Sequence, residues 1–257
     1  MSPQRSWTSV LLLADGRFPA GGHAHSGGRE AAVTAGTVRD MGSLELFLRG
    51  RLRTAGLVAA GLAAAACERA RSQGAAGCGP EGAAGRPGSW AALDAEADAR
   101  TPSPAQREAS RRQGRALLRA ARVAWPEAKC LAEIANVAQP PSRDAANAPL
   151  WDAAKAPHQP IVLGAAMAAA GGCPEDAAAV AAYQSVTGPA SAAVRLLSLD
   201  PIEVSGLLAR LADDIDDVAE RAIRASRDGS VIFPTASTHA AVSFSKSSSR
   251  ASILGLQ

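Results

Sequence analysis

The sequence predicts an all-α protein, a single-domain helical bundle of about eight to ten helices with a glycine-rich N-terminal loop and a disordered C-terminal tail. Of the 257 residues 47% are hydrophobic and only 4% are aromatic. Alanine, the best helix former, dominates the apolar share. Apolar residues in segments 44–66 and 204–222 recur at steps of three and four, which lines them along one helical face. The sequence shows no alternation of strands with helices and no internal repeat.

The first half of the chain is organised around one long helix. Leu44, Leu48 and Leu52 begin its apolar stripe, and the alanines and glycines that follow would let neighbouring helices approach closely. We therefore expect a buried central helix. The expected elements are a short helix at 6–14, a glycine-rich loop at 15–28, a second short helix at 29–35, the long helix at 41–71, a flexible loop at 72–89, and helices at 90–99, 105–124 and 127–137.

The second half carries clearer helix starts. After a proline-rich connection at 139–160, Pro174 followed by two acids predicts a helix that runs to Leu197 and bends at Gly188-Pro189. Asp200-Pro201 provides an N-cap and a first helical residue for a further helix, whose apolar stripe continues to residue 222. We expect a helical domain over residues 1–235 and a Ser-rich, disordered tail over 236–257.

Charge and cysteine usage favour a cytoplasmic protein that binds neither nucleic acid nor membrane. The formal net charge is only +3, and basic and acidic residues are mixed along most of the chain. The apolar run 57–66 is about half the roughly 20 residues that a membrane-spanning helix needs. Scattered cysteines without a CxxC pair indicate reduced thiols. They are Cys67, Cys78, Cys130 and Cys173.

The segment Asp15–Glu30 is the one that invites a chemical function. A phosphate-binding loop would need a preceding strand and a Gly-Lys-Ser/Thr ending, which this segment lacks. His23 and His25 could bind nickel or zinc, but two ligands are too few for a closed site. Ser26, His25 and Glu30 resemble a triad in composition, although neighbours in sequence seldom face one another productively. A shaped loop with a structural or interface role is the favoured interpretation.

Two charged helix faces are expected to be mainly solvent-exposed, with a partner surface as the alternative. The helix at 105–124 carries five arginines on one side, and the stripe near the C-terminus carries five acids largely opposite its apolar residues. The arginines are Arg107, Arg111, Arg115, Arg119 and Arg122. The acids are Asp213, Asp214, Asp216, Asp217 and Glu220.

The residues from Leu12 to Glu30 closely resemble the N-terminal motif of the urease accessory protein UreF family. The similar residues include Phe18-Pro19-Ala20-Gly21-Gly22 and His25-Ser26-Gly27-Gly28-Arg29-Glu30. Further similar segments follow in order, at 46–48, 158–165 and 190–197. The resemblance covers about residues 6–225.

The resemblance implies an all-helical accessory protein, not an enzyme, without a catalytic residue, metal ligand or cofactor of its own. UreF-type proteins join a UreD (or UreH) partner and the GTPase UreG, commonly as a central homodimer, in a complex that delivers nickel to apo-urease. By similarity, six residues would shape the partner-binding surface. They are Gly21, His25, Ser26, Gly28, Glu30 and Arg195.

The leading hypothesis is therefore an adaptor for GTP-dependent nickel insertion into urease. One alternative is a direct regulator of the UreG GTPase that supplies an arginine finger, for which Arg17, Arg29 and Arg115 are conceivable donors. Another is a nickel-binding carrier, which would need a cluster of ligands that four distant histidines do not suggest.

Overall fold

The computed structural model describes residues 7–15, 18, 36–75, 89–137 and 156–227. Within these ranges the chain forms helices and no strand, which confirms the expected all-α class. None of the helices found there is long and apolar enough to span a membrane. The elements are α1 Trp7–Ala14, α3 Met41–Arg51, the π-helix η2 Leu52–Gly56, α4 Leu57–Ala75, α5 Trp90–Arg100, α6 Pro104–Ala124, α7 Lys129–Val137, α8 Gln159–Ala169, α9 Pro174–Leu197, α10 Pro201–Arg210 and α11 Ala212–Arg227.

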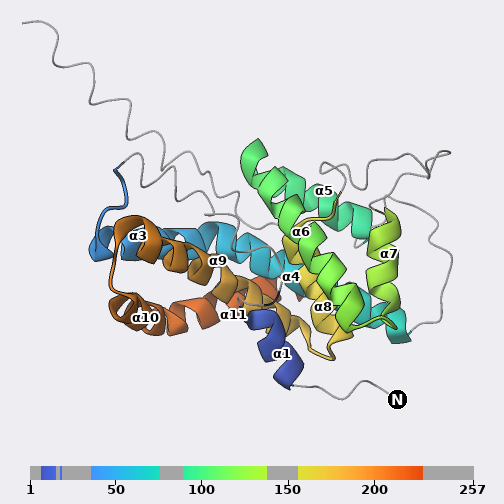
Figure 1. Cartoon of the computed structure of the whole chain (residues 1–257). Helices are drawn as coiled ribbons and strands as arrows, with labels where there is room; N and C mark the ends of the chain where they lie inside the picture. Colours follow the sequence, from blue (N-terminus) through green and yellow to red (C-terminus); the bar gives the residue numbers. More distant parts are fainter. Residues whose placement is uncertain (1–6, 16–17, 19–35, 76–88, 138–155, 228–257) are drawn as a thin grey trace, which may run out of the picture.

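Helix α4 lies at the centre of the bundle, as expected for the long helix. It packs against α8, α9 and α11, while α6 and α7 pack on α8. Figure 1 shows α5, α6 and α7 gathered at one end of the molecule, and α3 and α10 at the other. One hydrophobic core runs through these helices, so the described residues form a single bundle.

The crossing of α4 and α8 in the core depends on one glycine. A Cβ placed on Gly164 of α8 would lie 2.1 Å from the carbonyl oxygen of Ala63 and 2.8 Å from the Cβ of Ala66, both on α4. Only a residue without a side chain permits this approach. The alanines of α4 and the glycine of α8 therefore let the two backbones nearly touch.

The predicted helix at 41–71 is present but is not a regular α-helix throughout. Between α3 and α4, η2 contains one extra residue in its turn, and the Leu57 N–H donates to the carbonyl oxygen of Leu52. A Cβ on Gly56 would lie 2.7 Å from the Ser185 Oγ of α9. Arg51 also donates from Nε to the Ser185 carbonyl oxygen over 2.9 Å. Contacts with α9 therefore accompany the wider turn, and the apolar stripe of the sequence could not reveal it.

The stripe at 204–222 belongs to two helices, so the expectation of one continuous helix was wrong. Helix α10 ends at Arg210, and Leu211 caps it before α11 begins at Ala212. Leu211 is fully buried. The alternation of three and four persists across the break because both helices face the same core.

Other boundaries differ by a few residues. Residues 72–75, expected in a loop, extend α4, and Gln159 and Pro160, expected in a connection, open α8. The start of α9 at Pro174 and of α10 at Pro201 are as predicted, and the Asp200 carboxylate accepts from the Ile202 N–H over 2.8 Å. The expected helix at 29–35 and the tail at 236–257 lie outside the described residues.

Candidate functional site

The structure describes one of the six predicted partner-binding residues. Arg195 lies in the last turn of α9 with its side chain exposed. The other five, Gly21, His25, Ser26, Gly28 and Glu30, lie outside the described residues. Whether the six share one surface therefore stays a prediction.

The described residues at both ends of segment 19–35 are anchored to the bundle. On the N-terminal side, the Gln184 amide of α9 donates to the Leu13 carbonyl oxygen over 2.8 Å. The Phe18 ring then packs against Trp125, at the end of α6, with ring centroids 6.2 Å apart. On the C-terminal side, Gly36 takes a left-handed φ of 68°, and Val38 is buried. The core thus fixes where this segment leaves and rejoins the bundle.

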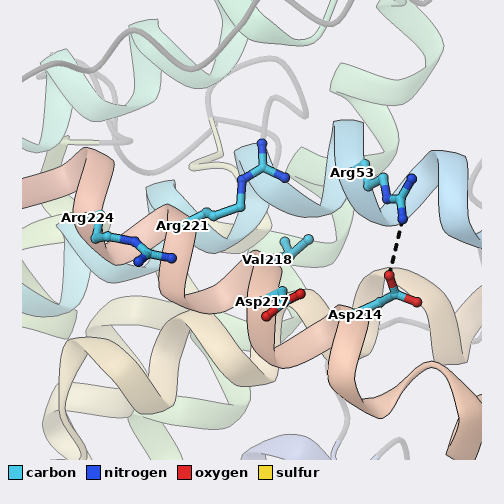
Figure 2. A pocket seen from close by; sticks show the side chains of 6 residues that line it. All are labelled: Arg53, Asp214, Asp217, Val218, Arg221 and Arg224. Atoms are coloured by element: carbon cyan, nitrogen blue, oxygen red, sulfur yellow. Dashed lines mark hydrogen bonds and ion pairs between the residues drawn. The ribbon is translucent and has the colours of Figure 1, made fainter.

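A charged groove of about 410 Å³ lies between η2 and α11. Figure 2 shows Arg53 reaching from η2 to Asp214, and Arg221 extending from α11 toward the opposite helix. The lining residues are Arg53, Asp214, Asp217, Val218, Arg221 and Arg224. This groove is open and polar rather than a closed pocket for a small molecule.

Ion pairs hold one wall of the groove together. Asp214 accepts from Arg53 Nη2 over 3.3 Å and also pairs with Arg49 of α3. Arg49 in turn pairs with Glu45 over 3.0 Å, and the hydrogen bond to Glu45 and the Asp214 charge raise the pKa of the Arg49 guanidinium. Asp214 therefore ties α11 to α3 and η2, while the groove contains no nucleophile paired with a base.

A second cluster joins α5, α6 and the start of α8 around His158, whose side chain is 1% exposed. Its Nε2 lies 2.9 Å from Asp98 Oδ1, and its backbone N–H donates to Asp94 Oδ1 over 3.0 Å. Because a carboxylate only accepts, Nε2 carries the proton. Arg111 bridges both acids, 2.8 Å from Asp94 and 2.6 Å from Asp98, and donates to the Ala156 carbonyl oxygen.

The ionisation of this cluster follows from burial and from the bridging arginine. Burial lowers the pKa of His158, and the charge of Arg111 acts in the same direction. Burial opposes the ionisation of Asp98, but hydrogen bonds from His158 and Arg111 outweigh it and lower the pKa of that carboxyl. These contacts favour a neutral His158 beside an ionised Asp98.

The sequence did not reveal that His158 meets two acids. One ligand atom each from Asp94, Asp98 and His158 lies within 4.8 Å of the others, which is the grouping of a possible metal site. However, Arg111 occupies the other oxygens of both carboxylates, and Arg107 Nε lies 3.9 Å from Asp98. Two cations at this distance disfavour a divalent ion. We interpret the cluster as a clamp that fixes the start of α8.

The arginine face of α6 is less exposed than predicted. Arg111 is buried and paired, and Arg107 donates to the Thr101 carbonyl oxygen over 2.6 Å. Arg119 and Arg122 are exposed, as expected. Arg115, a conceivable arginine finger, has its Nε and Nη2 buried and so is not extended toward solvent. The spacing of the arginines could not show that acids of α5 lie within reach of the first half of the face.

The acidic face of α11 is largely as expected, because Asp213, Asp216, Asp217 and Glu220 are exposed. The thiols described also agree with reduced cysteines. Cys67, Cys130 and Cys173 are free, and burial raises the pKa of Cys130 to about 11, which keeps it a thiol.

Comparison with known proteins shows the family of this helical bundle. The UreF family model matches residues 38–212, from the segment before α3 to the start of α11. The chain belongs to the UreF family. The match includes Arg195, and the resemblance stated from the sequence is thereby confirmed.

Several relatives named urease accessory protein UreF are similar over most of their length. The chain is 43% identical to the protein of Mycobacterium marinum over 205 residues, which is 79% of each chain. It is 42% identical to that of Mycobacterium sp. strain JLS over 222 residues, covering 86% of this chain and 87% of the relative. Identity to the Mycobacterium tuberculosis H37Rv protein is 38% over 216 residues, 83% of each.

Proposed function

We propose that this UreF-family chain is a urease accessory protein that acts as an adaptor. It holds a UreD/UreH-type protein and a UreG-type GTPase in one complex for GTP-dependent nickel insertion into apo-urease, with a homodimer of the chain at the centre. The observation that supports this most is family membership over residues 38–212.

The geometry is compatible with work done through protein contacts. Within the described ranges an open groove lined mainly by charged residues lies between η2 and α11, and the one grouping of possible metal ligands is occupied by a guanidinium. Surfaces of this kind suit a polar interface rather than a reaction centre. The loop residues Gly21, His25, Ser26, Gly28 and Glu30, together with Arg195, are proposed to contact the partners.

The test changes Gly28, where a large side chain would block the approach of a partner. If the backbone there has positive φ, any side chain also costs roughly 1 kcal/mol or more. Gly28→Arg should abolish urease activation and co-purification with the UreD/UreH-type and UreG-type proteins, while the far-UV circular dichroism stays helical and most thermal stability is kept.

Gly50→Arg is the matched control. Gly50 is exposed on α3, and a Cβ there would meet no atom within 4 Å. This variant should activate urease normally. Normal activation by Gly28→Arg would contradict a partner surface at the loop, and a loss of stability proportional to the loss of activity would indicate a turn in the core instead.

A further inference from the structure

Two glutamines link the start of α8, the middle of α9 and the end of α1. Gln184 of α9 donates from Nε2 to the Leu13 carbonyl oxygen over 2.8 Å, and Gln159 of α8 donates from Nε2 to the Gln184 Oε1 over 3.1 Å. We call Gln159 and Gln184 the glutamine bridge. Both residues are half-buried, so these hydrogen bonds are partly shielded from water and are stronger than they would be on an open surface.

The direction of both hydrogen bonds is fixed by the Leu13 carbonyl group. A carbonyl oxygen only accepts, so Gln184 must turn its NH2 group toward Leu13 and its amide oxygen toward Gln159. Gln159 then has to present its own NH2 group to Gln184. The bridge therefore has one arrangement, and a substitution that removes a single donor or acceptor breaks it at a known bond.

Gln159 is itself held by helix α6. It is the first residue of α8, where a backbone N–H has no acceptor within its own helix. The His158 side chain does not cap α8, and the Gln159 N–H instead donates to Ser110 Oγ of α6 over 3.3 Å. His158 is in turn fixed by Asp94 and Asp98. The glutamine bridge thus connects the clamp at the start of α8 to the end of α1.

Helix α1 is short and packs on the bundle with a narrow apolar face. Figure 1 shows it at the edge of the molecule. It has eight residues, of which Val10 and Leu13 are buried, whereas Trp7 is 60% exposed. A helix of this length is not stable alone in water, so its position depends on tertiary contacts. The last carbonyl groups of a helix receive no donor from the helix itself, and Gln184 supplies one to Leu13.

We propose that the glutamine bridge positions α1 for partner binding. The chain passes from the end of α1 into the motif Asp15–Glu30, so the orientation of α1 sets the direction in which that motif leaves the bundle. Gln159 and Gln184 act through Leu13 and are positioning residues rather than contact residues. The role in partner binding rests on the proposed function, whereas the fixing of α1 rests on the two hydrogen bonds.

Hydrogen–deuterium exchange of the full chain, measured in α1 by mass spectrometry, tests whether the bridge fixes this helix. Gln184→Glu keeps the acceptor for Gln159 but turns a carboxylate oxygen toward the Leu13 carbonyl oxygen, so exchange in α1 should be about tenfold faster. Gln184→Met only loses the hydrogen bonds and should show a smaller increase, about fivefold. Thr187→Val is the matched control, because Thr187 of the same helix donates to the Tyr183 carbonyl oxygen one turn earlier. It should leave exchange in α1 unchanged.

The affinity for the UreD/UreH-type protein, measured by biolayer interferometry, tests whether the position of α1 matters for docking. Gln184→Glu should bind about tenfold more weakly, and Thr187→Val should bind like the wild type. Gly164→Ala separates this effect from a general loss of stability, because it disturbs the crossing of α4 and α8 in the core. It should lower the midpoint of urea unfolding and keep the affinity, whereas Gln184→Glu should keep the midpoint and lose the affinity.

The proposal is wrong if exchange in α1 is the same in Gln184→Glu and the wild type, or if Thr187→Val accelerates it equally. It is also wrong if Gln184→Glu loosens α1 but binds the partner with wild-type affinity. A wild-type chain that does not bind the partner would contradict the proposed function, and with it the role of the bridge in docking. Faster exchange in Gln184→Glu would in that case still show that the glutamine bridge fixes α1.

Discussion

His158 makes the stability of the bundle depend on pH. Its folded-state pKa lies below the ordinary value, first because of burial and then because of Arg111. The unfolded chain, with a histidine pKa of about 6.5, therefore takes up a proton more readily than the folded chain. The contribution of His158 to stability is fully present above the unfolded-state pKa. It is lost as the pH falls from there toward the folded-state pKa. The pKa of Asp98 is lowered from 3.8, so the stability that Asp98 contributes is lost only in more acidic solution.

We expect the free energy of unfolding, measured with urea, to decrease between pH 7.5 and pH 5.5. In His158→Gln the decrease should be smaller, because glutamine does not titrate. The other three histidines of the chain remain in this variant and serve as an internal control. Equal slopes for the two proteins would show that His158 does not carry the pH dependence.

At the scale of elements, the crossing of α4 and α8 depends on the absence of a side chain at Gly164. An added methyl group would lie 2.1 Å from the Ala63 carbonyl oxygen, so the helices must separate. We expect Gly164→Ala to lower the free energy of unfolding by about 1–3 kcal/mol, the usual cost of overpacking a core. The measurement is chemical denaturation followed by circular dichroism.

The same substitution at Gly50 provides the comparison. Gly50 also lies in a helix, but a Cβ there meets nothing within 4 Å. Because alanine is the better helix former by about 1 kcal/mol, Gly50→Ala should leave stability unchanged or raise it. A stabilising effect of Gly164→Ala would mean that the two backbones are farther apart than the structure shows.

Helix starts were predictable from the sequence where local signals mark them. Interruptions within helices, which tertiary contacts determine, were not. Pro174 and Pro201 start helices as predicted, because a proline without an N–H suits the first turn. The π-helical turn at Leu52–Gly56 and the break at Leu211 were missed. The break at Leu211 preserves the spacing of apolar residues toward the core, so periodicity alone cannot distinguish it from a continuous α-helix. The π-helical turn shifts the buried face instead, because Ala55 is exposed while Gly56 and Leu57 are buried, and the small residues of this segment give no signal of that shift.

At the scale of the whole molecule, the pairing of distant residues was the least predictable property. Asp94 and His158 are 64 positions apart, and Arg49 and Asp214 are 165 apart. Charge patterns along single helices therefore predicted solvent-exposed faces, whereas Arg111 and Asp214 are used to join helices. The loop motif, in contrast, indicated the family directly, but five of the six candidate residues lie outside the described ranges.

The isolated protein is expected to hold no nickel at about micromolar concentration and to hydrolyse no GTP. Nickel should not bind because Arg111 already occupies the carboxylates beside His158, the one grouping of possible metal ligands found in the described ranges. GTP should not be hydrolysed because the sequence lacks the Gly-Lys-Ser/Thr ending of a phosphate-binding loop. Equilibrium dialysis with nickel and a GTPase assay provide the measurements. Stoichiometric nickel that is lost in His158→Gln would identify the clamp as a metal site. Nickel that is lost when His23 and His25 become alanine would support the carrier hypothesis.

The alanine-rich core has a consequence for how the molecule responds to force. Alanine has no side-chain rotamers, so its burial costs no rotamer entropy and it cannot repack by switching between them. When a partner binds at one end of the bundle, the central helices can therefore shift only as whole helices, and little binding free energy is lost to rearranging their buried side chains. The buried alanines of α4, α8 and α9 include Ala60, Ala63, Ala64, Ala66, Ala165, Ala166, Ala177, Ala178, Ala181, Ala182, Ala190 and Ala193.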